Sequence, residues 1–124
     1  MTLPALNWLG VKALALGVGD LERALRFYTV TLSLPLAYED GQPVGVRIGQ
    51  TLLFLKADWH APPSALLNPR VTLQTSDARA TEAALRALGV VIADPVAVYG
   101  QALVGSFLDS EGNKLWFCSE PEAG

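Results

Sequence analysis

Three side chains in the second half of the chain have the chemistry to hold a small molecule. Arg70 begins one strand-like segment, Gln74 follows four residues later, and Trp116 lies on the last strand-like segment. A guanidinium binds carboxylates or phosphates through paired hydrogen bonds and also stacks on aromatic rings. An indole offers a large, flat apolar surface. These residue types favour a site for an anionic or carbonyl-bearing aromatic ligand.

Further aromatic residues are candidates to line the same site. Phe54 lies on a strand-like segment of the first half, Trp59 lies in a Pro-rich connector, and Tyr99 precedes a strand-like segment. Each ring has an ordinary structural interpretation as well, since aromatic side chains also fill cores and cover loops. Arg70 can equally pair with a nearby acid or be solvated, and Trp116 can plug a cleft. The sequence leaves these alternatives open.

Residues suited to acid–base or nucleophilic catalysis are sparse. The only histidine, His60, has no second histidine or nearby cysteine with which to form a metal site or a triad. Glu39 and Glu111 are the other candidates for a general acid or base. The cation closest to Cys118 on its strand is Lys114, at roughly 13 Å, too far to activate a thiol. No catalytic residue is predicted, and enzymatic activity stays an open question.

Composition limits the classes of protein that the chain can be. It has 124 residues, of which 51% are hydrophobic and 17% charged, which excludes disorder and suits one domain with a sizeable core. A net charge of −3 without a basic run argues against a nucleic-acid partner. No uncharged apolar run reaches about 18 residues, so no membrane association is expected. The single cysteine excludes an internal disulfide and favours a cytoplasmic location.

The two halves of the chain repeat one order of segments. An apolar strand-like segment leads to Asp20 in the first half and to Asp77 in the second, and each Asp is a candidate helix N-cap. The first helix has apolar residues at i, i+3, i+4 and i+7, which we expect to be buried: Leu21, Ala24, Leu25 and Tyr28. In the second helix, the residues expected to face the core are Ala80, Ala84, Leu85 and Leu88.

Strand-like segments surround each helix. In the first half they cover 12–18, 36–40, 44–48 and 51–56, and in the second half 70–75, 90–93, 101–108 and 113–119. Each half is therefore a β-α-β-β-β module. We predict one α+β domain over 1–124, with module 1 over about 10–57, a connector over 58–69 and module 2 over about 70–119. Alternation should leave Arg70, Thr72 and Gln74, and also Lys114, Trp116 and Cys118, on a free concave face.

Several short motifs occur in the order typical of one superfamily. They are the strand–Asp–Leu helix openings, the Phe27-Tyr28 pair, the Leu32-Ser33-Leu34 tripeptide in place of Leu-Gly-Leu, and the turn over 109–113 in place of Asp-Pro-Asp-Gly-Asn. The chain resembles the vicinal oxygen chelate superfamily, which includes glyoxalase I, extradiol dioxygenases and bleomycin-binding proteins. The resemblance implies two β-α-β-β-β modules that form a concave mixed-sheet cleft.

In the metal-dependent members of that superfamily, four ligands meet in the cleft. The resemblance places these positions at Ala13, Phe54, Arg70 and Trp116, with a one-residue slip from Phe54 to Leu53 left open. None of the apolar side chains can ligate a divalent cation, and Arg70 would repel one. We therefore predict a member of the superfamily with no metal and no cofactor.

The function expected first is metal-independent binding of a small aromatic or anionic molecule, as in the bleomycin-resistance branch. One alternative is a glyoxalase-like lyase or another enzyme of the superfamily. A second alternative is an interaction dimer in which the cleft is closed. We expect a homodimer, and the cleft can form within one chain or across two.

Overall fold

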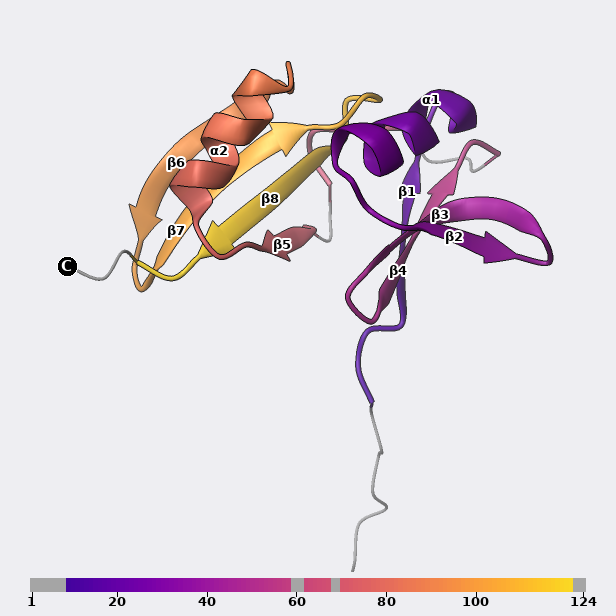
Figure 1. Cartoon of the computed structure of the whole chain (residues 1–124), viewed down its shortest axis with the longest axis horizontal. Coiled ribbons are helices and arrows are strands. Elements are labelled where there is room, and N and C mark those ends of the chain that lie inside the picture. The colour runs from indigo at the N-terminus through magenta and orange to yellow at the C-terminus, as the bar shows by residue number, and fades with distance from the viewer. Residues whose placement is uncertain (1–8, 59–61, 68–69, 122–124) are drawn as a thin grey trace, which may run out of the picture.

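The chain folds as two β-α-β-β-β modules that lie side by side (Figure 1). The computed structural model describes residues 9–58, 62–67 and 70–121. Module 1 comprises β1 (Ala13–Gly17), α1 (Leu21–Arg26), a π-helical turn η1 (Phe27–Thr31), β2 (Leu36–Glu39), β3 (Gln42–Ile48) and β4 (Thr51–Lys56). Module 2 comprises β5 (Thr72–Gln74), α2 (Ala78–Ala87), β6 (Ile92–Tyr99), β7 (Ala102–Leu108) and β8 (Lys114–Ser119). The predicted α+β fold is confirmed.

Each module contains one four-stranded mixed sheet. The strand orders are β1-β4-β3-β2 and β5-β8-β7-β6, with the first strand parallel to the last in both sheets. The registers correspond as well, because Ala15 pairs with Phe54 in module 1 and Thr72 pairs with Trp116 in module 2. Ala13 lies two residues before Ala15, and Arg70 lies two residues before Thr72. Phe54 is therefore the module 1 equivalent of Trp116, and Ala13 the equivalent of Arg70.

Both helices begin where the sequence predicts. The Asp20 carboxylate accepts a hydrogen bond from the Arg23 backbone N–H at 2.9 Å, and Asp77 accepts one from the Ala80 N–H at 3.1 Å. These are N-caps that satisfy amide groups left free by the first helical turn. In the part of the chain that the structure describes, no helix has the length and apolar character needed to cross a membrane.

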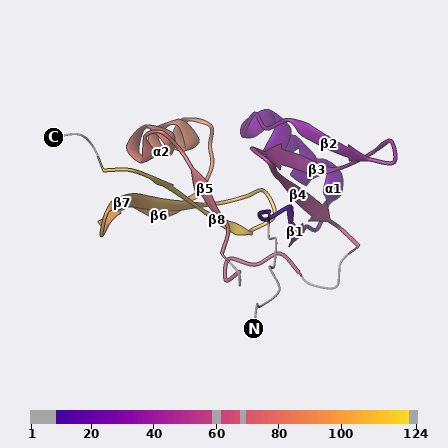
Figure 2. The ribbon, with the colours of Figure 1, turned by 90° about the horizontal axis from the view of Figure 1, so that it is seen from below.

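Alternation along the strands places the core on the helix side of both sheets. Leu16, Val18, Val71, Leu115 and Phe117 are all buried there, and Leu14 and Leu73 are half-buried. These residues belong to one hydrophobic cluster that also contains residues of α1 and α2. Figure 2 shows α2 covering one face of the module 2 sheet. The opposite face of each sheet lies away from this core and is available for functional side chains.

The core-facing stripe of α2 differs from the prediction. Ala80, Ala84 and Leu88 are exposed, and the only residues of α2 that are fully buried are Ala78 and Leu85. The stripe that faces the core instead contains Ala78 and Leu85, with the polar residue Glu82 between them. The Glu82 carboxylate accepts a hydrogen bond from the Val96 backbone N–H at 2.6 Å, which lowers the pKa of Glu82. Because Glu82 binds β6, the spacing of apolar residues alone could not identify the face of α2 that contacts the core.

Strand β6 also differs from the predicted segment over 90–93. It starts at Ile92 and continues to Tyr99, with Pro95 inside it. Pro95 lacks a backbone donor and is tolerated because β6 is the edge strand and its register with β7 shifts between Asp94 and Ala97. Likewise β3 starts at Gln42, two residues before the predicted start at residue 44. Pro43 is tolerated within it because it lies opposite a register shift in β2.

The turn between β7 and β8 joins the two modules. The Glu111 carboxylate accepts hydrogen bonds from the Gly19 and Asp20 backbone N–H groups, at 2.9 and 3.0 Å, and from the Arg23 guanidinium at 2.7 and 2.8 Å. The Arg23 hydrogen bonds are the largest cause of a Glu111 pKa that is lowered to about 2. Figure 1 shows this turn reaching from the module 2 sheet toward α1. We call this turn, residues 109–113, the clasp.

Buried groups at the base of the clasp extend the connection. The Tyr28 hydroxyl donates to Asp109 Oδ2 at 2.8 Å, and the Asn113 Nδ2 donates to the Gly17 carbonyl at 2.8 Å. Burial raises the pKa of Tyr28 well above its usual value, and the Asp109 charge adds to this effect. The clasp therefore sets how module 2 lies against module 1.

Candidate functional site

Arg70 and Trp116, predicted to share one face of the module 2 sheet, are in contact. The Arg70 Cζ lies 4.1 Å from the centroid of the Trp116 ring system, and the Lys114 Nζ lies 4.5 Å from it. Both distances are within the range of cation–π attraction. Arg70 is exposed, whereas Trp116 and Lys114 are half-buried. An aromatic ring with two cations on it is thus presented on the face opposite to α2.

The two cations differ in their partners. Lys114 Nζ lies 2.5 Å from Asp94 Oδ2, and the Ser106 hydroxyl donates to the same carboxylate. The hydrogen bond from Lys114 holds the pKa of Asp94 below its usual value, with a smaller contribution from Ser106. Among the described residues, Arg70 makes no ion pair with a carboxylate. Lys114 is therefore neutralised by a local acid, whereas the Arg70 guanidinium forms no ion pair within the described part of the chain.

Arg70 also lies between two hollows. One has a volume of about 210 Å³ and is lined by Arg70, Lys114, Trp116 and residues 65–67. The other, which we call the inter-module hollow, has a volume of about 630 Å³ and lies between β1, β4 and β5. Arg70 and Gln74 line it together with apolar side chains from both modules, among them Leu14, Leu53 and Leu73. A ligand held by Arg70 therefore has an aromatic, cationic surface on one side and an apolar one on the other.

The other predicted site residues lie elsewhere. Phe54 is half-buried on β4 and lines neither of these two hollows, and Tyr99 is exposed at the end of β6. Trp59 lies outside the described residues. By register Phe54, and not Leu53, corresponds to Trp116, while Leu53 is buried and lines the inter-module hollow. The structure thus places Arg70 against Trp116 and in one hollow with Gln74, and leaves Phe54 and Tyr99 apart from them.

The residues at the four superfamily positions do not fit a metal ion. Ala13, Phe54 and Trp116 offer no donor atom, and the Arg70 guanidinium stacks on the indole at the position where a fourth ligand would be needed. Among the described residues, no cluster of three or more His, Cys, Asp or Glu side chains is arranged to hold a metal.

The two candidate acids that the structure describes, Glu39 and Glu111, are not arranged for catalysis. Glu111 is fully engaged in the clasp, and Glu39 is exposed at the end of β2. His60 lies outside the described residues. Cys118, on β8, is half-buried.

Two polar residues of this face could not be identified from the sequence. Asp94 falls beyond the predicted end of its strand, and Ser106 reads as an ordinary small residue within an apolar run. Both contact the Lys114 end of the site because β6 pairs with β7 with Asp94 opposite Ser106, and β7 pairs with β8 with Ser106 opposite Trp116. An Asp-Pro pair inside an apolar segment was the available signal, since it is typical of an irregular edge strand.

Comparisons with known proteins identify the family. A family model described as Glyoxalase/Bleomycin resistance protein/Dioxygenase superfamily matches residues 10–117. The chain therefore belongs to this superfamily, as the sequence motifs indicate. A search of curated proteins finds no significant match.

Solved structures show the same fold. TnmS3, an antibiotic binding protein from Streptomyces sp. CB03234, is 24% identical with a TM-score of 0.81, over 94% of this chain and 100% of that one. A putative glyoxalase family protein from Bacillus anthracis is 13% identical with a TM-score of 0.78, over 94% and 100%. A superfamily member from Sphaerobacter thermophilus DSM 20745 is 22% identical with a TM-score of 0.75, over 93% and 100%.

Proposed function

We propose that this protein is a metal-independent, cytoplasmic small-molecule binding protein that holds an aromatic ligand with a carboxylate or carbonyl group at Arg70. The observation that carries this proposal is the exposed Arg70 guanidinium, stacked on Trp116 and free of an ion pair among the described residues. The indole holds the guanidinium plane in place, which lowers the entropy lost when a ligand binds its edge. The similarity to an antibiotic binding protein supports this class of function.

The stacking also constrains how the ligand lies. Because Arg70 and Lys114 already lie over the Trp116 ring, a planar ligand is expected to reach the guanidinium edge or its outer face. The apolar part of the ligand then extends toward the inter-module hollow beside Gln74. Direct stacking on the indole would first require Arg70 to move.

Titration of 2-naphthoate into the wild type and Arg70→Ala by isothermal calorimetry tests this proposal. A charge-assisted hydrogen bond contributes about 1.5–3 kcal/mol, so the substitution should weaken binding roughly tenfold or more. Arg47 is also exposed and lies on β3, so Arg47→Ala is the matched control and should bind 2-naphthoate as the wild type does. The melting temperature should hardly change in either variant. Equal affinities for the wild type and Arg70→Ala would contradict the proposal.

We further propose that the protein is a homodimer. The outer edge strands support this, because β2 exposes Tyr38 at 63% and β6 exposes Val98 at 65% and Tyr99 at 67%. Exposed apolar side chains on sheet edges are typical of surfaces that another chain covers. Tyr99, which lies apart from Arg70 within one chain, would then be covered by the second copy. Sedimentation equilibrium at micromolar concentration tests this, and a monomeric mass would contradict it.

A further inference from the structure

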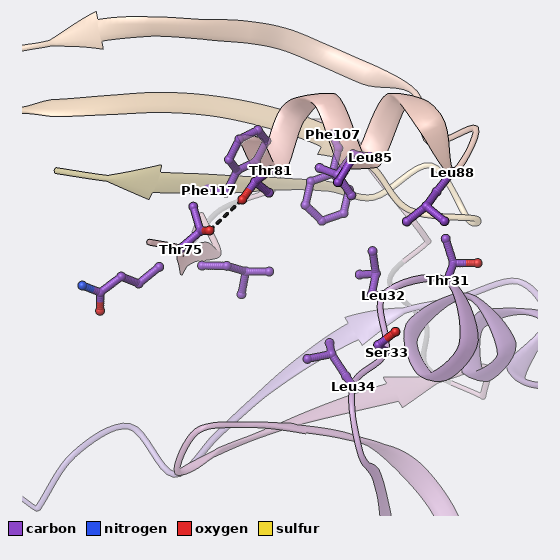
Figure 3. Close-up of a pocket in the computed structure, with 13 residues that line it drawn as sticks. Thr31, Leu32, Ser33, Leu34, Thr75, Thr81, Leu85, Leu88, Phe107 and Phe117 are labelled. Atoms are coloured by element: carbon purple, nitrogen blue, oxygen red, sulfur yellow. Dashed lines mark hydrogen bonds between the residues drawn. The ribbon is translucent and has the colours of Figure 1, made fainter. Parts of the chain in front are cut away.

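A third hollow lies on the helix side of the molecule, away from Arg70. It has a volume of about 320 Å³ and lies between α2 and the segment that follows η1 (Figure 3). Phe107 and Phe117 lie on the sheet side, Leu85 and Leu88 come from α2, and Leu32 and Leu34 face them from module 1. We call it the α2 hollow. Its volume falls within the range of natural small-molecule pockets.

The lining of the α2 hollow carries no charge. Apart from the apolar residues, it contains only hydroxyl and amide side chains, such as Ser33, Gln74 and Thr81. A charged ligand would lose its hydration there without gaining a counter-ion. The site at Arg70 has the opposite character, so the two hollows select different ligands. The α2 hollow fits an uncharged molecule.

One pair of hydroxyl groups in this hollow can orient a ligand. The Thr75 and Thr81 hydroxyls are 2.6 Å apart and share one hydrogen bond (Figure 3). Whichever hydroxyl accepts that bond keeps its own proton, which it can donate to a third group. The pair therefore offers one O–H donor at the edge of an otherwise apolar surface.

The module 1 wall of the hollow has an unusual backbone. It follows the π-helical turn η1, and Ser33 has a φ of 58°, in the left-handed region. Isolated π-helical turns and left-handed non-glycine residues both cost free energy and are enriched at functional sites. This backbone turns Leu32 and Leu34 so that both line the hollow instead of only one of them.

From these observations we propose that the α2 hollow is a second binding site, for a neutral, mostly apolar molecule with one hydrogen-bond acceptor directed to the Thr75–Thr81 pair. The apolar part of the ligand packs against Phe107, Phe117 and Leu88, which is 57% exposed without a ligand. The lining of this site does not include Arg70, although it shares Leu73 and Gln74 with the inter-module hollow.

Two matched substitutions on α2 test the proposal. Ala84 and Ala87 are both exposed on the same helix, but only Ala84 lines the hollow. Ala84→Phe should fill the hollow without disturbing the core, and Ala87→Phe should leave it open. The probe is 2-naphthalenemethanol, followed by methyl NMR. Its binding should shift the methyl signals of Leu32, Leu34, Leu85 and Leu88. Ala84→Phe should lower the affinity at least tenfold, and Ala87→Phe should not change it.

The double substitution Thr75→Val and Thr81→Val tests the hydrogen bond separately, because either hydroxyl alone could still donate to the ligand. Valine keeps the shape of threonine, so the affinity for 2-naphthalenemethanol should fall about fivefold, as expected for one hydrogen bond, while naphthalene should bind unchanged. The anion 2-naphthoate should not shift the same methyl signals. The proposal is overturned if the wild type shows no saturable binding of 2-naphthalenemethanol, or if Ala84→Phe binds it as well as Ala87→Phe does.

Discussion

The two modules share their strand order and register but carry different chemistry on the face opposite the helices. At equivalent positions, module 1 has Ala13 and Phe54 where module 2 has Arg70 and Trp116. The helix-side positions, in contrast, are apolar in both modules. The fold depends on the buried side of each strand, because burial there supplies most of the stabilisation. The other side can therefore differ between copies of one topology, and in this chain only module 2 presents a cation on an aromatic ring at these positions.

The turns before the last strands differ in the same way. Module 1 connects β3 to β4 through Gly49 and Gln50 alone, whereas module 2 uses the longer clasp over 109–113. The clasp makes hydrogen bonds to the other module, from Glu111 to the N-terminus of α1 and from Asp109 and Asn113 at its base. Module 2 thus supplies both the candidate ligand site and the main polar connection between the modules.

The largest expected effect comes from removing the clasp carboxylate. Glu111 accepts hydrogen bonds from the Gly19 and Asp20 N–H groups and from Arg23, and its side chain is 0% exposed. We expect Glu111→Ala to lower the free energy of unfolding by about 2–3 kcal/mol, because amide donors lose a charged acceptor. Glu39→Ala, which removes an exposed acid at the end of β2, is the control and should change stability by less than about 0.5 kcal/mol. Urea unfolding measures both, and equal stabilities would mean that the clasp does not hold the modules together.

The pH dependence of stability provides a second test of the clasp. The Glu111 pKa is about 2 in the folded chain, against a usual value of 4.5. The folded state therefore favours the ionised form, and this stabilisation is fully present above about pH 4.5 and is lost as the pH falls toward 2. Glu111→Gln should be less stable than the wild type at pH 6, and the difference should shrink at pH 2.5. A difference that does not change with pH would contradict this account.

The smallest expected effect comes from copying the module 2 face onto module 1. The double substitution Ala13→Arg and Phe54→Trp changes two half-buried residues outside the core. Stability should change by less than about 1 kcal/mol, as for other substitutions away from buried groups. If the Arg–Trp pair is sufficient to bind an aromatic carboxylate, calorimetry should show a second equivalent of bound 2-naphthoate. A single equivalent would show that Lys114 or the inter-module hollow is also required.

Much of the fold was predictable because local chemistry repeats. Asp20 and Asp77 cap their helices, and strand alternation correctly separates Leu115 and Phe117 from Trp116. The errors arose where polar groups take positions usually held by apolar ones. Glu82 lies in the core-facing stripe of α2 because it binds a β6 amide, a contact about which helical periodicity carries no information.

The candidate site was only partly predictable. Strand alternation places Arg70 and Trp116 on one face, and the parallel pairing of β5 with β8 brings them together. The pairing of Lys114 with Asp94 depends on the irregular register of β6, and it decides which cation remains available. The separation of Phe54 from this site likewise follows from how the modules pack, which no local pattern encodes.

By itself, the sequence determined the superfamily, the two-module α+β fold, the helix starts and the alternation of residues along the regular strand β8, because these depend on motifs, caps and alternation between neighbouring residues. Tertiary structure alone decided the partners of Lys114 and Glu111, the inward turn of Glu82 and the positions of the hollows along β5. These features join residues far apart in the chain, and their geometry is set by register shifts and by the packing of one module on the other.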